Sequence, residues 1–213
     1  IYYDYKNLSN IGDELRPGIV HRIDKDTSGL VLIAKNNASH EILSKQFNEH
    51  SISRVYQALI WGKLRPQNGR IETYITRSSK NRQLMQVSSS KGKVAITNYK
   101  TLEVFENNKT PTLSLVECKL ETGRTHQIRV HMKSIGHPII FDDDYGGGIK
   151  MIKSFHIKHT KLLKSIFKSM DRVALHAKSI KFLHPNKDVV EYDAPIPDDF
   201  KKVINLAKAN EPL

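Results

Sequence analysis

Strand-like segments separated by short turns fill the middle of the sequence, and this arrangement restricts the fold more than any other feature. The segments are rich in β-branched and aromatic residues, and turn-forming stretches such as Pro66–Gly69 separate them. Because few helices alternate with these strands, the sequence predicts an α+β fold with a mixed, largely antiparallel sheet and flanking helices. The predicted strands in this block are Arg54–Trp61, Arg70–Thr76, Lys93–Glu106 and Thr112–Glu121.

Helices and further strands are predicted on both sides of this block. A buried strand is expected over Gly29–Lys35. Thr125–Gly136 is predicted as a helix with Thr125 as its N-cap and Gly136 as its stop. With 213 residues, the chain is expected to form a single domain over residues 1–213. The other predicted elements are a helix over Ser39–His50, a basic amphipathic helix over Lys153–Met170, strands over Ala174–Leu183 and Val189–Tyr192, and a helix from about Asp198.

Charge and composition indicate a polyanionic partner. Lys and Arg number 34 against 22 Asp and Glu, which gives a net charge of +12 and a pI near 9.7. Such a charge suits a polyanionic partner through counterion release, and charge alone does not choose between RNA, DNA and a membrane surface. The longest apolar run, Gly29–Ala34, is far shorter than the ~20 residues that a bilayer crossing needs, so no membrane association is expected. The lone Cys118 excludes an internal disulfide, and without a visible export signal we expect a cytoplasmic protein, and a monomer.

The ten histidines do not follow the spacing of a metal site. His156 and His159 have no nearby carboxylate, and His126 and His131 would face different sides of a helix. We therefore expect no metal.

The densest polar cluster lies between residues 16 and 29 and contains Asp24 and Asp26. A calcium loop that began at Asp24 would need a glutamate at its twelfth position, which is Lys35, so this alternative fails. A simpler alternative is that both aspartates accept hydrogen bonds from backbone amides in a turn.

The same aspartate pair also permits an enzymatic alternative. In a magnesium-dependent aspartyl phosphatase of the haloacid dehalogenase kind, Asp24 would be the nucleophile and Asp142–Asp144 could supply carboxylates for the metal. However, such a loop follows a wholly apolar strand, and here His21 and Arg22 stand immediately before it. The phosphatase is therefore the weaker alternative.

The segment His21–Leu30 resembles the signature of the RluA/RluD family of pseudouridine synthases, in which the aspartate after His-Arg-Leu is catalytic. Ten residues match with one conservative change, at Ile23. Further segments resemble the family's other motifs in the expected order, so the resemblance covers almost the whole chain. They are Arg54–Ala58 for the tyrosine motif, Glu121–His131 for the arginine motif, and Ala174–Ala177 with Phe182–Pro185 for the C-terminal pattern.

The resemblance implies isomerisation of uridine to pseudouridine in structured RNA, with neither cofactor nor metal. Closeness to the RluD type implies large-subunit (23S) ribosomal RNA as the substrate. Asp24 would initiate cleavage of the glycosidic bond as nucleophile or base, Tyr56 would stack on the target uracil and assist proton transfer, and Arg129 would pair with Asp24. Arg22 would enter the RNA helix where the flipped nucleotide leaves it.

The chemistry of the residues fits these roles independently. A buried carboxylate is costly unless a cation compensates its charge. Arg129 flanks the apolar stripe of Ile128 and Met132 on the predicted helix, so its stem can pack while its head reaches a half-buried carboxylate. Phosphate contacts are expected from Arg124, His126, Lys133 and the lysines of the basic helix, and a solvated basic face is the alternative.

Two features depart from the family pattern. Members usually begin with a strand that carries a Lys-Pro-x-Gly element, often after a small S4 RNA-binding domain, and this sequence starts beyond both; we therefore expect an N-terminally truncated catalytic domain. Asp142–Gly147 also differs from the usual Gly-Asp-x-x-Tyr-Gly. Besides the phosphatase, the alternative function is a catalytically silent RNA-binding or ribosome-assembly module.

Overall fold

The computed structural model describes residues 8–11, 17–107, 110–156 and 159–208. Within these residues, eight strands form one sheet in the order β1-β7-β2-β6-β5-β3-β4, and β8 also pairs with β7. The strands are β1 (Ser28–Gly29), β2 (Ser53–Trp61), β3 (Asn68–Arg77), β4 (Met85–Ser88), β5 (Lys93–Asn107), β6 (Thr110–Leu120), β7 (Leu175–Leu183) and β8 (Val189–Asp193). Only β1 and β7 run parallel, so the prediction of a mixed, largely antiparallel α+β sheet is confirmed.

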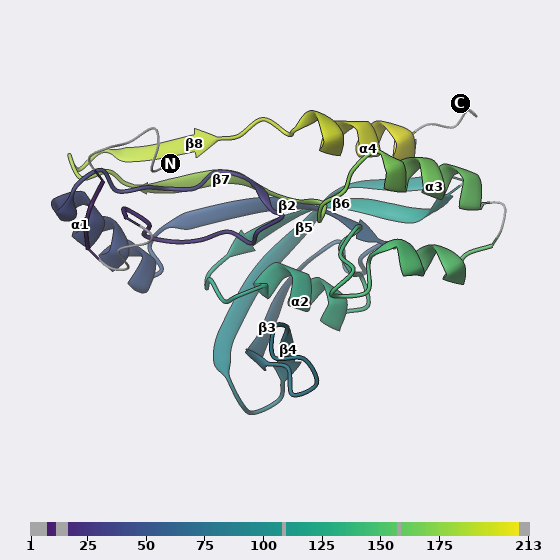
Figure 1. The fold of residues 1–213 in the computed structure, drawn as a ribbon, viewed down its shortest axis with the longest axis horizontal. Helices are drawn as coiled ribbons and strands as arrows, with labels where there is room; N and C mark the ends of the chain where they lie inside the picture. Colours follow the sequence, from purple (N-terminus) through teal and green to yellow (C-terminus); the bar gives the residue numbers. More distant parts are fainter. Residues whose placement is uncertain (1–7, 12–16, 108–109, 157–158, 209–213) are drawn as a thin grey trace.

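The helices flank this sheet at three places (Figure 1). One of them, α1, lies at one end of the molecule, and α3 and α4 pack together at the opposite end, while α2 lies against the sheet between them (Figure 1). The helices are α1 (Asn37–Asn48), α2 (Gln127–Ser134), a 3-10 helix η1 (Ile149–Ser154), α3 (Thr160–Lys168) and α4 (Asp198–Lys208). In the part of the chain that is described, no helix has the length and apolar character required to cross a membrane.

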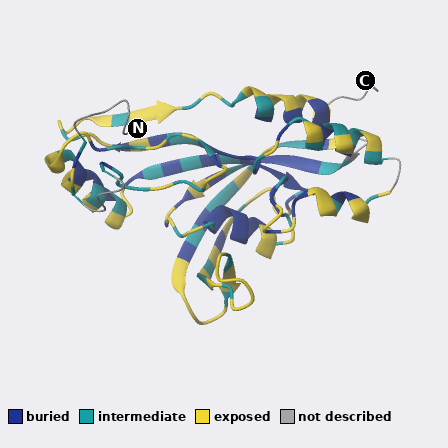
Figure 2. Ribbon diagram, viewed as in Figure 1, coloured by how far each residue is buried: buried dark blue, intermediate teal, exposed yellow. Residues whose placement is uncertain are grey.

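The core follows the central strands, which are buried along most of their length (Figure 2). Ala58 to Trp61 of β2 are at most 3% exposed, because they pair with β6 and belong to the main hydrophobic core. Trp61 donates its indole N–H to the carbonyl of Gly147 at 2.9 Å and stacks on Phe155 at 5.0 Å. β2 is therefore a rigid base for the residues at its beginning.

The predicted strand over Gly29–Lys35 is largely wrong. Only Ser28 and Gly29 pair with β7, and the following residues run beside Gly18 instead, with the amide of Ala34 donating to the Gly18 carbonyl at 2.8 Å. The reason lies in the sheet: β8 pairs with residues 179–183 of β7 and occupies the edge that a longer β1 would need.

The predicted helix over Lys153–Met170 is interrupted. Its first part is the 3-10 helix η1, and its last part is α3, while residues 157–158 lie outside the described residues. Phe155 ends η1 in an extended conformation and packs on Trp61. The burial of this ring against Trp61 explains why the apolar stripe does not continue as one helix.

The start of α2 also differs from the prediction. Its N-cap is His126, with φ of 54°, and not Thr125. The side chain of Gln127 organises this turn: its Oε1 accepts hydrogen bonds from the Arg124 amide at 3.0 Å and the Thr122 hydroxyl at 2.8 Å, and its Nε2 donates to the Ile96 carbonyl at 2.9 Å. A tertiary contact with β5 therefore replaces the local cap.

Candidate active site

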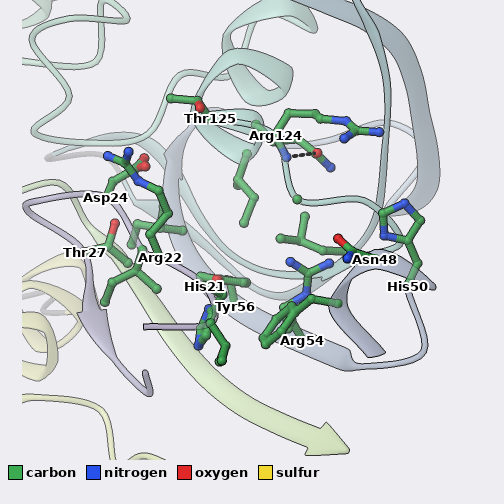
Figure 3. A pocket seen from close by; sticks show the side chains of 18 residues that line it. His21, Arg22, Asp24, Thr27, Asn48, His50, Arg54, Tyr56, Arg124 and Thr125 are labelled. Carbon is green, nitrogen blue, oxygen red and sulfur yellow. Dashed lines mark hydrogen bonds between the residues drawn. The ribbon is translucent and has the colours of Figure 1, made fainter. Parts of the chain in front are cut away.

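A pocket of about 410 Å³ lies between the segment 20–27, the start of β2 and the residues that lead into α2. Figure 3 shows Asp24 and Arg22 together at one end of the pocket, and Arg54 with His50 at the other. Tyr56 lies between the two ends. Segments more than 100 residues apart in the sequence thus line one hollow.

The turn that carries Asp24 is fixed by the backbone. The Thr27 amide donates to the Asp24 carbonyl at 3.0 Å, and Ser28 bonds to His176 of β7 at 2.9 Å. Gly29 has φ of 107° and lies against the backbone of Ala177, where a Cβ would collide, so the turn requires glycine at this position. Because the backbone closes the turn, the Asp24 carboxylate points away from the loop and toward α2.

Arg129 on α2 meets this carboxylate, and two further carboxylates as well. Its Nη1 lies 3.6 Å from Asp24 Oδ2, its Nε and Nη2 each donate to Asp142 at 2.8 Å, and Nη2 donates to Asp144 at 2.9 Å. Asp142 is completely buried. Burial alone would lower the pKa of Arg129, but the hydrogen bonds to Asp142 and Asp144 outweigh it and raise the pKa above its ordinary value. The guanidinium is therefore permanently charged and held in one orientation.

Tyr145 packs its ring against the guanidinium of Arg129. Its ring lies 4.8 Å from the Arg129 guanidinium and 5.6 Å from the Lys133 ammonium, both in cation–π geometry. Its hydroxyl accepts from the Met85 amide at 2.9 Å and bonds His126 Nδ1 at 2.8 Å. Burial raises the pKa of Tyr145 to about 12. The ring thus ties α2 and β4 to the loop that carries Asp142.

Tyr56 and His21 form the middle of the pocket. Tyr56 is 7% exposed, and burial raises the pKa of its phenol against the opposing effect of Arg54. His21 stacks on Phe47 at 4.6 Å, and its Nε2 accepts from the Leu32 amide at 2.8 Å. Burial and the charge of Arg54 lower the pKa of His21 to about 4, so this imidazole is neutral at neutral pH.

The residues predicted to contact RNA fall into two groups. Arg22 and Arg124 line the pocket, and Arg22 is exposed at its edge. His126 and Lys133 instead surround the ring of Tyr145, which places them behind Arg129 and outside the pocket lining.

The carboxylates of the phosphatase alternative are engaged elsewhere. Asp142 and Asp144 bind Arg129, and Asp143 is exposed. Among the residues that the structure describes, no three His, Cys, Asp or Glu side chains are grouped as metal ligands. The arrangement therefore gives a magnesium-dependent mechanism no support.

An aspartate thus lies beside an arginine at one end of a pocket that Tyr56 lines, on a largely antiparallel sheet. The sequence model of the RNA pseudouridylate synthase family matches residues 3–134. The chain belongs to this family.

Individual relatives agree over nearly the whole chain. It is 44% identical over 208 residues to ribosomal large subunit pseudouridine synthase D of Zymomonas mobilis, which covers 97% of this chain and 61% of the relative. It is 42% identical over 205 residues to an RNA pseudouridine synthase of Bacillus subtilis, covering 96% of this chain and 60% of that protein. The chain thus spans about three fifths of these relatives. The structure of human RNA pseudouridylate synthase domain containing 1 superimposes with a TM-score of 0.67 at 26% identity, over 91% of this chain and 81% of the human one.

The sequence interpretation missed the residues that hold Arg129 in place. Asp142 and Tyr145 occupy the aspartate and tyrosine of the Gly-Asp-x-x-Tyr-Gly pattern, although the segment as a whole departs from it. Phe141 stands where the pattern has glycine and adopts φ of 68°, with its ring on Phe167 at 4.6 Å. The aspartate of this pattern could therefore have indicated Asp142 as a carboxylate partner of Arg129 in addition to Asp24.

Proposed function

We propose that this chain isomerises uridine to pseudouridine in structured RNA, with Asp24, Tyr56 and Arg129 as its catalytic residues. The proposal depends on one observation: the Asp24 carboxylate lies 3.6 Å from the Arg129 guanidinium, beside a pocket that Tyr56 lines. Family membership supports the same reaction.

The reaction needs no external reactant. The bond between uracil N1 and ribose C1′ breaks, the base rotates, and a bond forms between C5 and C1′, while C5 loses a proton and N1 gains one. Asp24, which lies beside the Arg129 guanidinium, begins this sequence as nucleophile or base. Tyr56 enters as a neutral phenol because burial raises its pKa, so it offers a flat face for stacking and a hydroxyl for proton transfer.

Extraction of the target nucleoside from its stack costs a few kcal/mol, and the protein must offset this cost. Arg22 is exposed beside Asp24, where it can enter the space that the flipped nucleotide leaves (Figure 3). The net charge of +12 favours the RNA backbone as a whole. Because a relative is named as a large-subunit ribosomal enzyme, we propose large-subunit ribosomal RNA as the substrate.

The test compares Asp24→Asn with the parent on RNA tritiated at uracil C5. The parent should release tritium, also in excess EDTA, and Asp24→Asn should release none. The variant should still fold, because Arg129 keeps its hydrogen bonds to Asp142 and Asp144. Asp26→Asn, which alters an exposed carboxylate of the same turn, is the matched control and should act like the parent.

Three outcomes would contradict the proposal. Equal release by Asp24→Asn and the parent removes Asp24 from the chemistry. RNA binding without release by the parent indicates a silent binding module. Metal-dependent phosphate release indicates the phosphatase. The substrate is tested separately by mapping pseudouridine in total RNA from a strain that lacks the gene, where one large-subunit position should lose its modification.

A further inference from the structure

Arg54, at the start of β2, is a buried cation that the proposed chemistry does not use. Its residue is 8% exposed, and its side chain lines the pocket. The guanidinium lies 5.6 Å from the Phe47 ring and against Gly123, where a Cβ would collide with Nη1. Within the described residues, its buried Nε has no hydrogen-bond partner and no carboxylate forms an ion pair with it.

The surroundings of Arg54 do not balance its charge. Burial is the largest effect and lowers its pKa; Tyr56 acts in the opposite direction, and the charge of Arg124 lowers the pKa by a smaller amount. His21 beside it is neutral at neutral pH. A buried guanidinium without an anion is unfavourable, because the protein replaces neither its hydration nor its counterion. The folded chain therefore holds an unmatched positive charge in the pocket.

The position of this charge relates it to the proposed substrate. Arg54 and Tyr56 are two residues apart on one face of β2, a separation of about 6.6 Å along the strand. Asp24 lies at the opposite end of the pocket (Figure 3). With the base on Tyr56 and its ribose facing Asp24, the end of the pocket at Arg54 faces a neighbouring part of the RNA chain, away from the carboxylate.

We propose that Arg54 binds a backbone phosphate of the RNA chain next to the nucleotide whose base occupies the pocket beside Tyr56. A guanidinium presents a planar pair of donors that matches phosphate oxygens, and the anion supplies the charge that the folded protein lacks at this point. Arg124, which lines the same pocket and holds its Nε on the Val94 carbonyl at 2.8 Å, adds a second positive charge to this end. The inference rests on the proposed function, since it presumes an RNA substrate.

The test measures RNA affinity against salt concentration for Arg54→Met and the parent. Loss of one phosphate contact should reduce the slope of log K against log salt by about one, and weaken binding about fivefold at 0.15 M salt. Arg54→Lys should keep most of the slope, because it keeps the charge. Lys100→Met removes an equal charge from an exposed residue outside the pocket lining and should leave the slope at the parent's value.

Unfolding of the free chain separates binding from packing. If the role of Arg54 is to bind a phosphate, Arg54→Met should be at least as stable to urea as the parent, because the substitution removes an unmatched charge. A destabilised Arg54→Met with an unchanged salt slope would show that Arg54 only packs on Phe47 and would overturn the inference. Should methionine prevent folding, Arg54→Gln removes the same charge and the slope decides in the same way.

The two proposals fail in different ways. If Arg54→Met keeps the salt slope of the parent and the parent releases tritium, only the proposed phosphate contact is contradicted. If Arg54→Met reduces the salt slope but the parent releases no tritium, the proposed isomerase activity is contradicted, and the pocket remains an RNA-binding site.

Discussion

Two equally buried arginines lie near the two ends of the pocket, Arg129 behind Asp24 and Arg54 in the lining, and their charges are balanced in opposite ways. Arg129 is 7% exposed and contacts three carboxylates, whereas Arg54 is 8% exposed and has none among the described residues. Burial is the same at both ends, so the difference lies in the partners. At the Asp24 end, carboxylates of the protein already balance the charge of the arginine. At the Arg54 end, in our proposal, a bound phosphate balances it.

The largest effect should come from exchanging the balanced arginine. Arg129→Met leaves Asp142 completely buried without its cation, and we expect the free energy of unfolding to fall by about 3–5 kcal/mol. Arg54→Met, the matched change at the other end, should not lower the free energy of unfolding. Urea unfolding of both variants measures this contrast, and equal stabilities would show that the partners do not distinguish the two ends.

A smaller effect should appear when the buried histidine behind Arg129 is protonated. His131 bonds Thr73 and Thr97 at 3.0 and 2.9 Å, and burial lowers its pKa from 6.5 to about 4. The unfolded chain therefore takes up a proton that the folded chain refuses, so stability is full above pH 6.5 and is lost as the pH falls toward 4. At pH 5 the contribution of this histidine to the loss is roughly 2 kcal/mol.

His131→Gln should reduce the fall in unfolding free energy between pH 7 and pH 5 by that amount. The comparison uses the pH dependence and not the absolute stability, so any constant cost of the substitution cancels. His184→Gln, at an exposed position, is the control and should keep the pH dependence of the parent. An unaltered pH dependence in His131→Gln would contradict the prediction.

The smallest effect should follow from removing one hydroxyl beneath Arg129. Tyr145→Phe keeps the ring but leaves the Met85 amide and His126 without their partner, which should cost about 1–2 kcal/mol of unfolding free energy. Tyr74→Phe, at a tyrosine that is 40% exposed, should stay within about 0.5 kcal/mol of the parent. If both variants match the parent, the hydroxyl does not help to hold the balanced end.

The fold class was predictable because apolar and polar residues alternate along the strands of the central block, and because these strands lie close together in the sequence. Arg54–Trp61 was expected and β2 spans Ser53–Trp61, since periodicity and short turns act locally. Gly29–Lys35 was not a strand, because the edge of β7 that it needed was occupied by β8, a competition that no local pattern reveals.

The sequence by itself determined the class of fold, the basic character and the residues that resemble catalytic ones, because each is written in local periodicity, composition or a contiguous motif. Only the tertiary structure decided that Arg129 binds Asp142 more closely than Asp24, at 2.8 Å against 3.6 Å. It also decided that Arg54 stays buried with no carboxylate paired to it among the described residues. The physical reason is that the balance of a buried charge depends on every group that folding brings around it, and those groups come from distant parts of the chain.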